Sequence, residues 1–283
     1  MKVFNSNLEE FVKCELKKIG YSYRENTDLH NNFLVLSNRL RRVPIERKRK
    51  VVKASTFKYP KEYTEQYQRF IARSEAGDSL LSLCSRKNNK HSFQIRDQLF
   101  DDWGIIHFHF DELGTKEVMF AVVTSDTIYL LATYAHGKGH GNVWYQKELI
   151  EIIHYEFPFL IEHLKLNKGN QQSTEIEHRH ARKYSYNRPI VLSDGTSYYP
   201  TGGGVMINKT SMHDLRSWML LSRTVDSYEM YVKNNIGKIA YGHGVQNTDI
   251  EFSLIYKFNP ITELFDVKCK SNYGVEVLLE QSI

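Results

Sequence analysis

Two histidines alternate with apolar residues in the segment Ile106-His107-Phe108-His109-Phe110. Side chains of an extended strand point alternately to its two sides, so His107 and His109 share one side and the apolar residues share the other. Histidine has the side-chain pKa nearest neutrality, so a group of imidazoles can both accept and donate a proton. The segment therefore predicts a strand that packs on one face and offers two imidazoles on the other.

A third histidine follows in the glycine-rich segment Ala135-His136-Gly137-Lys138-Gly139-His140-Gly141. Two apolar runs precede it, at 118–123 and 127–135, and the short polar link between them is typical of a hairpin. Three antiparallel strands thus follow one another closely. This order predicts that His136 converges with His107 and His109.

Such a group suits the cleavage of RNA through its own 2′-hydroxyl. One imidazole removes the hydroxyl proton, a second protonates the departing 5′-oxygen, and a cation stabilises the phosphorane between them. Lys138 is the candidate cation. We therefore expect an endoribonuclease that needs neither a metal nor another cofactor.

Helices are expected around this central block. Apolar residues recur at helical spacing in 6–19, 60–87 and 146–156, with Pro60 at a helix start and Gly77 as an interruption. The apolar stretches 33–36 and 51–52 are interpreted as strand or loop. His154 falls on the apolar side of the third helix, and we expect it in the core or at the helix end.

A basic run lies between the first two helical patterns. Its positive residues are Arg39, Arg41, Arg42, Arg47, Lys48, Arg49, Lys50 and Lys53. Such a run is either a solvated face or a surface that contacts phosphates. For the second case the expected RNA-binding residues are Arg41, Arg42, Arg47, Lys48, Arg49 and Lys50.

The length of 283 residues allows two domains of roughly 100 to 150 residues each. Residues 166–183 are polar and lack periodicity, which predicts a linker between a catalytic domain at 1–165 and an accessory domain at 184–283. The accessory part has a hairpin pattern around Asp194-Gly195, a helical pattern at 211–232 and strand patterns at 251–258 and 264–279. The expected fold class is α+β, with a helical N-terminal part packed on a small antiparallel sheet and a second small mixed domain after it.

Composition narrows the protein class. There is no apolar run of about 18 residues and no signal-peptide pattern at the start, so we expect a cytoplasmic protein that does not enter a membrane. The three cysteines, Cys14, Cys84 and Cys269, are widely spaced, which favours reduced, buried thiols over a disulfide framework or a structural zinc site. The net charge of +5 is modest.

The order of elements from Asp101 to Ile153 resembles the RelE family of bacterial toxins and the wider barnase-like group of ribonucleases. In that family the first strand of a three-strand meander alternates apolar and RNA-contacting residues, as His107 and His109 do here. The resemblance implies a role for Tyr145 at the catalytic site. Trp144 and Tyr145 stand at the entry to a helix, where aromatic residues either pack in the core or stack on an RNA base. The resemblance also implies a toxin-antitoxin or phage-defence role, with RNA, an antitoxin or inhibitor protein, or the ribosome as partners. Histidines replace the family's usual lysines and arginines, which favours a free histidine-based ribonuclease.

Two other interpretations stay open. The basic run and the 18 tyrosines also suit a non-enzymatic nucleic-acid-binding or regulatory protein. Alternatively, His107 and His109 with His136 or His140 would make an open zinc site for a hydrolase. If alanine at both His107 and His109 leaves the biological effect intact, the non-enzymatic interpretation is favoured. If a chelator removes the activity and zinc restores it, the zinc interpretation is favoured.

Overall fold

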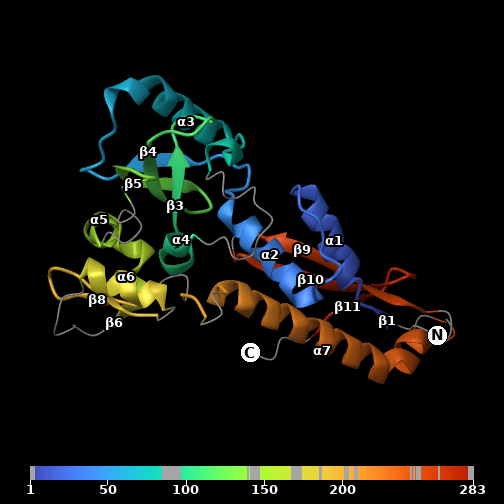
Figure 1. Ribbon diagram of the computed structural model, residues 1–283. Coiled ribbons are helices and arrows are strands. Elements are labelled where there is room, and N and C mark those ends of the chain that lie inside the picture. The colour runs from blue at the N-terminus through green and yellow to red at the C-terminus, as the bar shows by residue number, and fades with distance from the viewer. Residues whose placement is uncertain are drawn as a thin grey trace. The chain divides into compact units, whose positions relative to one another are not determined.

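The computed structural model shows a mixed α+β protein (Figure 1). It describes residues 4–84, 97–138, 140, 147–166, 174–184, 187–200, 204–206, 210–242, 244, 246, 250–260 and 262–279. The chain divides into two compact units, one formed by 1–37 with 214–283 and the other by 38–213. Each unit has its own sheet and its own core.

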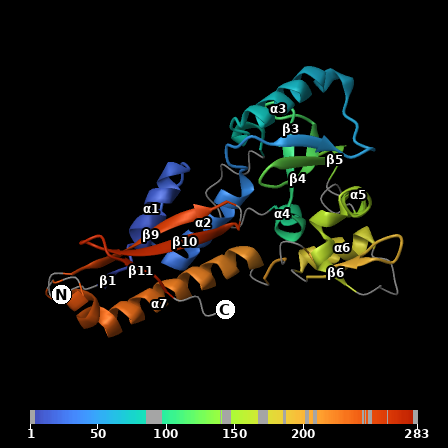
Figure 2. The same ribbon diagram turned by 180° about the vertical axis from the view of Figure 1, so that it is seen from behind.

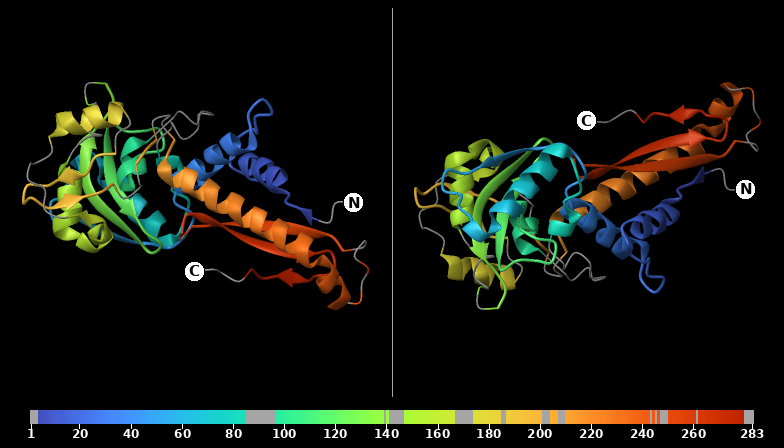
Figure 3. Two further views of the ribbon diagram at one scale, coloured as in Figure 1. Left: turned by 90° about the horizontal axis from the view of Figure 1, so that it is seen from below. Right: turned by 90° about the horizontal axis from the view of Figure 1, so that it is seen from above.

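The first unit joins the two ends of the chain. Its sheet has the order β1-β9-β10-β11, in which β9 and β10 form a long antiparallel pair and β1 lies parallel to β9. The helix α7 runs alongside β9 and β10 (Figure 3). The elements of this unit are β1 (Phe4–Asn5), α1 (Leu8–Lys18), the first part of α2 (Leu29–Arg42), most of α7 (Met212–Gly242), β9 (Phe252–Asn259), β10 (Leu264–Ser271) and β11 (Glu276–Val277).

This division differs from the predicted boundary at 166–183. The ring of Phe33, in α2, lies 5.3 Å from Trp218 in α7 and 5.0 Å from Phe265 in β10. Side chains of the N-terminal helices and of the C-terminal segment therefore pack in one common core. Residues 175–183, expected in a linker, form helix α6 (Glu175–Lys183) within the second unit.

The second unit contains the predicted three-strand meander. Its main sheet has the order β2-β5-β4-β3, with β3, β4 and β5 antiparallel in succession and β2 parallel to β5. The strands are β2 (Lys50–Lys53), β3 (Ile105–His109), β4 (Glu117–Val123) and β5 (Thr127–Ala135). The hairpin expected around Asp194-Gly195 is also present, as β7 (Ile190–Val191) and β8 (Ser197–Tyr198), and β6 (Lys165–Leu166) extends it.

Helices cover the meander on both faces (Figures 1 and 2). On one face Phe70 of α3 (Thr64–Ala76) contacts Phe108, with ring centroids 5.1 Å apart. On the other face lie α4 (Gln98–Trp103) and α5 (Glu148–Glu156). Every residue of β3 is buried, so the expectation of a solvent-facing side with two open imidazoles was wrong. A strand alternation by itself shows which residues share a face, but not whether a helix packs on it.

Most of the predicted helices are present with shifted ends. The 60–87 pattern becomes a short helix η1 (Lys61–Tyr63), then α3, which ends where Gly77 adopts a left-handed φ of 87°, and then η2 (Leu81–Leu83). The 33–36 segment, expected as strand or loop, lies inside α2, where Phe33, Leu34 and Leu36 are buried. Two more short helices lie in the described part of the chain, η5 (Pro158–Leu160) and η6 (Glu162–Leu164).

No helix among the described residues is long and apolar enough to cross a membrane. All three cysteines are free thiols: Cys84 and Cys269 are buried, as expected, and Cys14 is exposed. Burial raises the pKa of Cys84 to about 12 and that of Cys269 to about 11. The two buried thiols are therefore protonated at neutral pH and contribute to packing.

Candidate active site

Three imidazoles come together on the face of the sheet that carries α4 and α5. The ring centroid of His107 lies 6.1 Å from that of His109 and 6.1 Å from that of His136, and the rings of His109 and His136 are 5.0 Å apart. His136 follows β5 directly, and its backbone N–H donates to the carbonyl of Lys116 at 2.9 Å. The predicted convergence of these three residues is confirmed. His107 and His109 are buried, and His136 is half-buried.

Asp97 lies behind His107. The Nδ1 atom of His107 is 3.4 Å from Oδ2 of Asp97. The other carboxylate oxygen of Asp97 accepts the N–H of Phe100 at 3.2 Å and so caps α4. A cap holds its side chain in one position, so α4 presents this carboxylate to His107 in a fixed orientation.

Asp97 carries the negative charge needed to orient His107. Burial alone would raise its pKa, but the hydrogen-bonding contact with His107 and the charges of His107 and Arg42 bring the pKa below its ordinary value. The carboxylate is therefore ionised at neutral pH. An ionised carboxylate at Nδ1 favours the tautomer of His107 in which Nδ1 carries the proton and Nε2 is the acceptor.

His109 has the opposite tautomer. Its Nδ1 accepts the backbone N–H of Thr115 at 2.9 Å, so in the neutral ring the proton is on Nε2. The hydroxyl of Thr115 donates to the carbonyl of Glu117 at 2.5 Å and accepts the N–H of Phe110 at 3.2 Å. The turn from β3 to β4 thus makes His109 a hydrogen-bond donor at Nε2.

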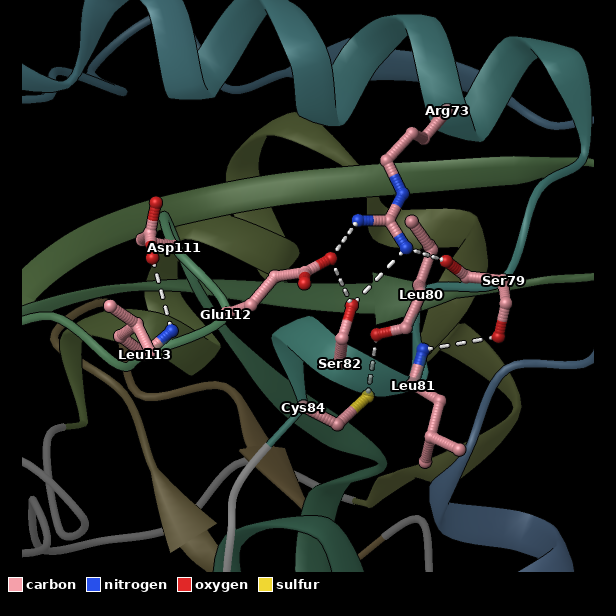
Figure 4. A network of polar contacts seen from close by, with 9 residues as sticks. All are labelled: Arg73, Ser79, Leu80, Leu81, Ser82, Cys84, Asp111, Glu112 and Leu113. Atoms are coloured by element: carbon pink, nitrogen blue, oxygen red, sulfur yellow. Dashed lines mark hydrogen bonds and ion pairs between the residues drawn. The ribbon is translucent and has the colours of Figure 1, made fainter.

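A polar network anchors this turn to α3 and η2 (Figure 4). Arg73 of α3 contacts Glu112 at 2.8 Å, and the hydroxyl of Ser82 donates to the same carboxylate oxygen at 2.7 Å. These bonds, that of Ser82 first, lower the pKa of Glu112. At the preceding position Asp111 accepts the N–H of Leu113 at 3.0 Å. The network helps to keep Thr115 in reach of His109.

His136 resembles His107 in its tautomer. Its Nδ1 lies 2.8 Å from the carbonyl oxygen of Lys116, which can only accept, so Nδ1 carries a proton. Nε2 is then the acceptor in the neutral ring and a donor when the ring is protonated. The rings of His107 and His136 can thus take up a proton at Nε2, whereas the neutral ring of His109 donates a hydrogen bond from Nε2.

The sequence analysis missed Asp97. This residue is ten positions before His107, and the six-residue helix that it caps was not predicted. A weak indication was present, because Asp97 precedes the apolar residues Leu99 and Phe100 in the manner of an N-cap. Only the packing of α4 on the sheet brings its carboxylate to the imidazoles.

The basic run separates into buried and exposed members. The side chains of Arg41 and Arg42 are 2% and 4% exposed, and their guanidinium groups lie 3.7 and 3.4 Å from the buried carboxylate of Asp101. Arg49 is also buried, and it donates to the carbonyl oxygens of Ile45 and Thr124 at 2.8 and 2.9 Å.

These three arginines were expected to bind RNA, and the structure instead places them in the interior of the second unit. Burial, followed by the nearby charge of Arg47, lowers the pKa of Arg49. The pattern of charges along the chain could not distinguish an arginine that pairs with a distant aspartate from one that faces solvent. Of the six expected RNA-binding residues in the run, Arg47, Lys48 and Lys50 are exposed.

The other predicted residues lie apart from the three imidazoles or outside the description. Lys138 and His140 are exposed in the segment after His136. Trp144 and Tyr145 lie outside the described residues. His154 contacts Tyr198 and Asp194, and it thereby connects α5 to the β7–β8 hairpin.

Metal binding has little support here. Among the described residues, no group of three or more His, Cys, Asp and Glu side chains is arranged to hold a metal ion. The tautomer of His109 also opposes the predicted zinc site, because a protonated Nε2 has no lone pair for a metal. The rings of the group are better suited to exchanging protons.

No family model matches this sequence, and no curated protein or solved structure matches it either. The chemistry of the site is therefore argued from its own residues.

Proposed function

We propose that this protein is a metal-independent endoribonuclease that cleaves RNA by attack of the 2′-hydroxyl on the adjacent phosphorus. The observation that carries the proposal is the group of three imidazoles within 6.1 Å of one another, with Asp97 behind one of them. Acid and base catalysis need groups of near-neutral pKa on both sides of the reacting phosphate. Histidines in complementary tautomers meet that need without a metal.

In this mechanism His107 is the general base. Its Nε2 takes the proton of the 2′-hydroxyl, and the carboxylate of Asp97 stabilises the imidazolium that forms. The 2′-oxygen forms a bond to phosphorus, and the bond from phosphorus to the 5′-oxygen breaks. The strand with the new 3′-end carries a 2′,3′-cyclic phosphate.

His136 is the general acid. When protonated, it keeps one proton in the bond to the carbonyl of Lys116 and gives the other, from Nε2, to the departing 5′-oxygen. The N–H at Nε2 of His109 donates to a non-bridging phosphate oxygen, where negative charge increases in the transition state. Lys138 supplies a positive charge near the same end of β5, and Tyr145 keeps the catalytic role that the resemblance implies.

The burial of the site residues suggests from which side the RNA reaches the three imidazoles. His107 and His109 are each 5% exposed, while His136 is half-buried and Lys138 is exposed. A nucleotide would enter from the side of His136 and Lys138. A single-stranded substrate fits this route, since a base in a duplex cannot leave its stack without cost.

The test uses the full-length purified protein and a single-stranded RNA with a labelled 5′-end, in the presence of a chelator. We expect cleavage and a 2′,3′-cyclic phosphate on the labelled product. Alanine at His107 or His136 should reduce the rate by roughly 10²–10⁴-fold, the usual contribution of one acid or base. His163→Ala is the matched control, because His163 is an exposed histidine elsewhere in the same unit.

Two outcomes separate the other interpretations. Activity that the chelator abolishes and zinc restores would support the metal hydrolase. A protein that binds RNA but cuts none, alone or on translating ribosomes, would support the non-enzymatic alternative. A toxin role predicts in addition that induced expression arrests growth and that His107→Ala relieves the arrest.

A further inference from the structure

Two exposed residues of β2, an edge strand of the main sheet in the second unit, lie near aromatic side chains of neighbouring elements. Val52 of β2 pairs with Tyr129 of β5, and Lys50 pairs with Thr127. Because side chains alternate along a strand, Lys50 and Val52 share the face of the sheet on which Tyr129 lies. Lys50 is exposed and Val52 is 39% exposed.

Aromatic rings cover the neighbouring part of this face. The ring of Tyr129 lies 5.0 Å from that of Phe157, which is buried, and 5.6 Å from that of Phe159, which is 58% exposed. The planes of Tyr129 and Phe159 meet at 66°. The half-buried ring of Tyr129 thus lies beside Val52, and the exposed ring of Phe159 lies beside Tyr129. Single exposed apolar residues are common on protein surfaces, but aromatic rings in a basic region are typical of a nucleic-acid-binding site.

The charge of this region is positive. Residues 46–53 contain five cations and one carboxylate, and Arg47, Lys48, Lys50 and Lys53 are exposed. The carboxylate of Asp126, near Lys50, accepts hydrogen bonds from the hydroxyls of Thr124 and Thr127 at 3.0 and 3.3 Å. That of Glu156, in α5, accepts the N–H and the hydroxyl of Ser55. With Glu46 these two carboxylates make three negative charges, fewer than the five cations of residues 46–53.

We propose that this surface, made of Lys50, Val52, Tyr129 and Phe159, binds single-stranded RNA, and that the exposed Arg47 and Lys48 of the preceding segment add positive charge nearby. A base stacks on the exposed ring of Phe159, which Tyr129 contacts edge-on, and Lys50 contacts a neighbouring phosphate. A duplex fits less well, since its bases are stacked on one another. The inference rests on the proposed function only for the choice of RNA as the ligand.

The surface is independent of the three imidazoles. A variant without catalytic activity should therefore still bind RNA here. The proposal also specifies which residues of the basic run contact phosphate. The buried Arg41, Arg42 and Arg49 have no part in it.

Binding is measured by fluorescence anisotropy with a labelled oligouridine of about 12 nucleotides, within the size range of single-strand sites. The full-length protein carries His107→Ala in every sample, so that the RNA is not cut. Phe159→Ala should weaken binding roughly tenfold, which is the expected loss of one stacked base. Tyr241→Ala is the matched control, because Tyr241 is 89% exposed in the other unit, and it should leave binding unchanged.

The phosphate contacts are tested by salt dependence. Lys50→Ala should reduce the slope of log affinity against log salt concentration by about 0.7, the value of one phosphate contact on a single strand. Lys257→Ala, an exposed lysine on β9, should leave the slope unchanged.

The proposal is overturned if the protein does not bind the oligouridine at low salt, if Phe159→Ala binds as tightly as its parent, or if a duplex of equal length binds equally well. These outcomes differ from a failure of the proposed function. If the unmodified protein cuts no RNA while binding still depends on Phe159, the ribonuclease proposal fails and the surface stands. If RNA is cut while Phe159→Ala changes neither affinity nor KM, the surface fails and the ribonuclease stands.

Discussion

Two histidine-centred groups in the second unit have similar parts and different arrangements. In one, His154 is bonded at both ring nitrogens: Nδ1 lies 2.8 Å from the hydroxyl of Tyr198 and Nε2 lies 3.2 Å from the carboxylate of Asp194. In the other, His107 also faces a carboxylate, but two more imidazoles lie within 6.1 Å of it.

A histidine beside a carboxylate is therefore not enough to indicate catalysis. With both nitrogens held by protein partners, His154 connects α5 to the β7–β8 hairpin and has no ring atom to offer a substrate. The three-imidazole group brings together rings whose backbone partners set different tautomers. The number of imidazoles that meet, and the different tautomers that their backbone partners set, distinguish a proposed active site from a structural connection.

The largest expected effect is on the rate of RNA cleavage, and it appears when His136→Ala is compared with His154→Ala. The first should reduce RNA cleavage by roughly 10²–10⁴-fold and leave the melting temperature nearly unchanged, because His136 is half-buried at the end of a strand. The second should lower the melting temperature while the folded protein still cleaves. Initial rates and thermal unfolding of both variants are the measurements. Equal losses of cleavage in the two variants would remove the distinction between the groups.

A smaller effect is expected for Asp97→Asn. The neutral amide keeps the shape of the side chain but removes the charge that stabilises the imidazolium of His107, so cleavage should fall roughly tenfold or more. The pKa of Asp97 lies below its ordinary value, so the carboxylate stays ionised above about pH 4 and protonates only in stronger acid.

The pH profile is the check on this variant. In stronger acid, below about pH 4, the carboxylate of the parent takes up a proton, so the rate advantage of the parent over Asp97→Asn should shrink there. An advantage that persists unchanged in that acid would show that the charge of Asp97 is not its source.

The smallest effect is expected for Tyr198→Phe. The change removes the hydroxyl bonded to His154 and leaves a buried ring, so the free energy of unfolding should fall by about 1 kcal/mol. Urea unfolding measures it, and RNA cleavage should be unaffected. A loss of cleavage without a loss of stability would place His154 and Tyr198 in the proton-transfer chemistry and merge the two groups.

The sequence alone was sufficient for the local geometry. The alternation in β3 placed His107 and His109 on one face, and the short links after β3 and β4 brought His136 to the same end of the sheet. Helical periodicity located α1, α3, α5 and α7, and Asp194-Gly195 marked the hairpin between β7 and β8. These features follow from strand and helix periods and turn preferences, which depend on residues close together in the chain.

Tertiary structure alone decided burial and partners. The helices α4 and α5 cover the imidazole face, Asp97 reaches His107, and Arg41 and Arg42 turn inward to Asp101. The contact of Phe33 with Trp218 joins the N-terminal helices to the last segment of the chain. None of these contacts has a characteristic spacing, because residues far apart in sequence meet only when whole elements pack. The local pattern thus determined which side chains share a face, and the packing determined which of them meet solvent, a carboxylate or one another.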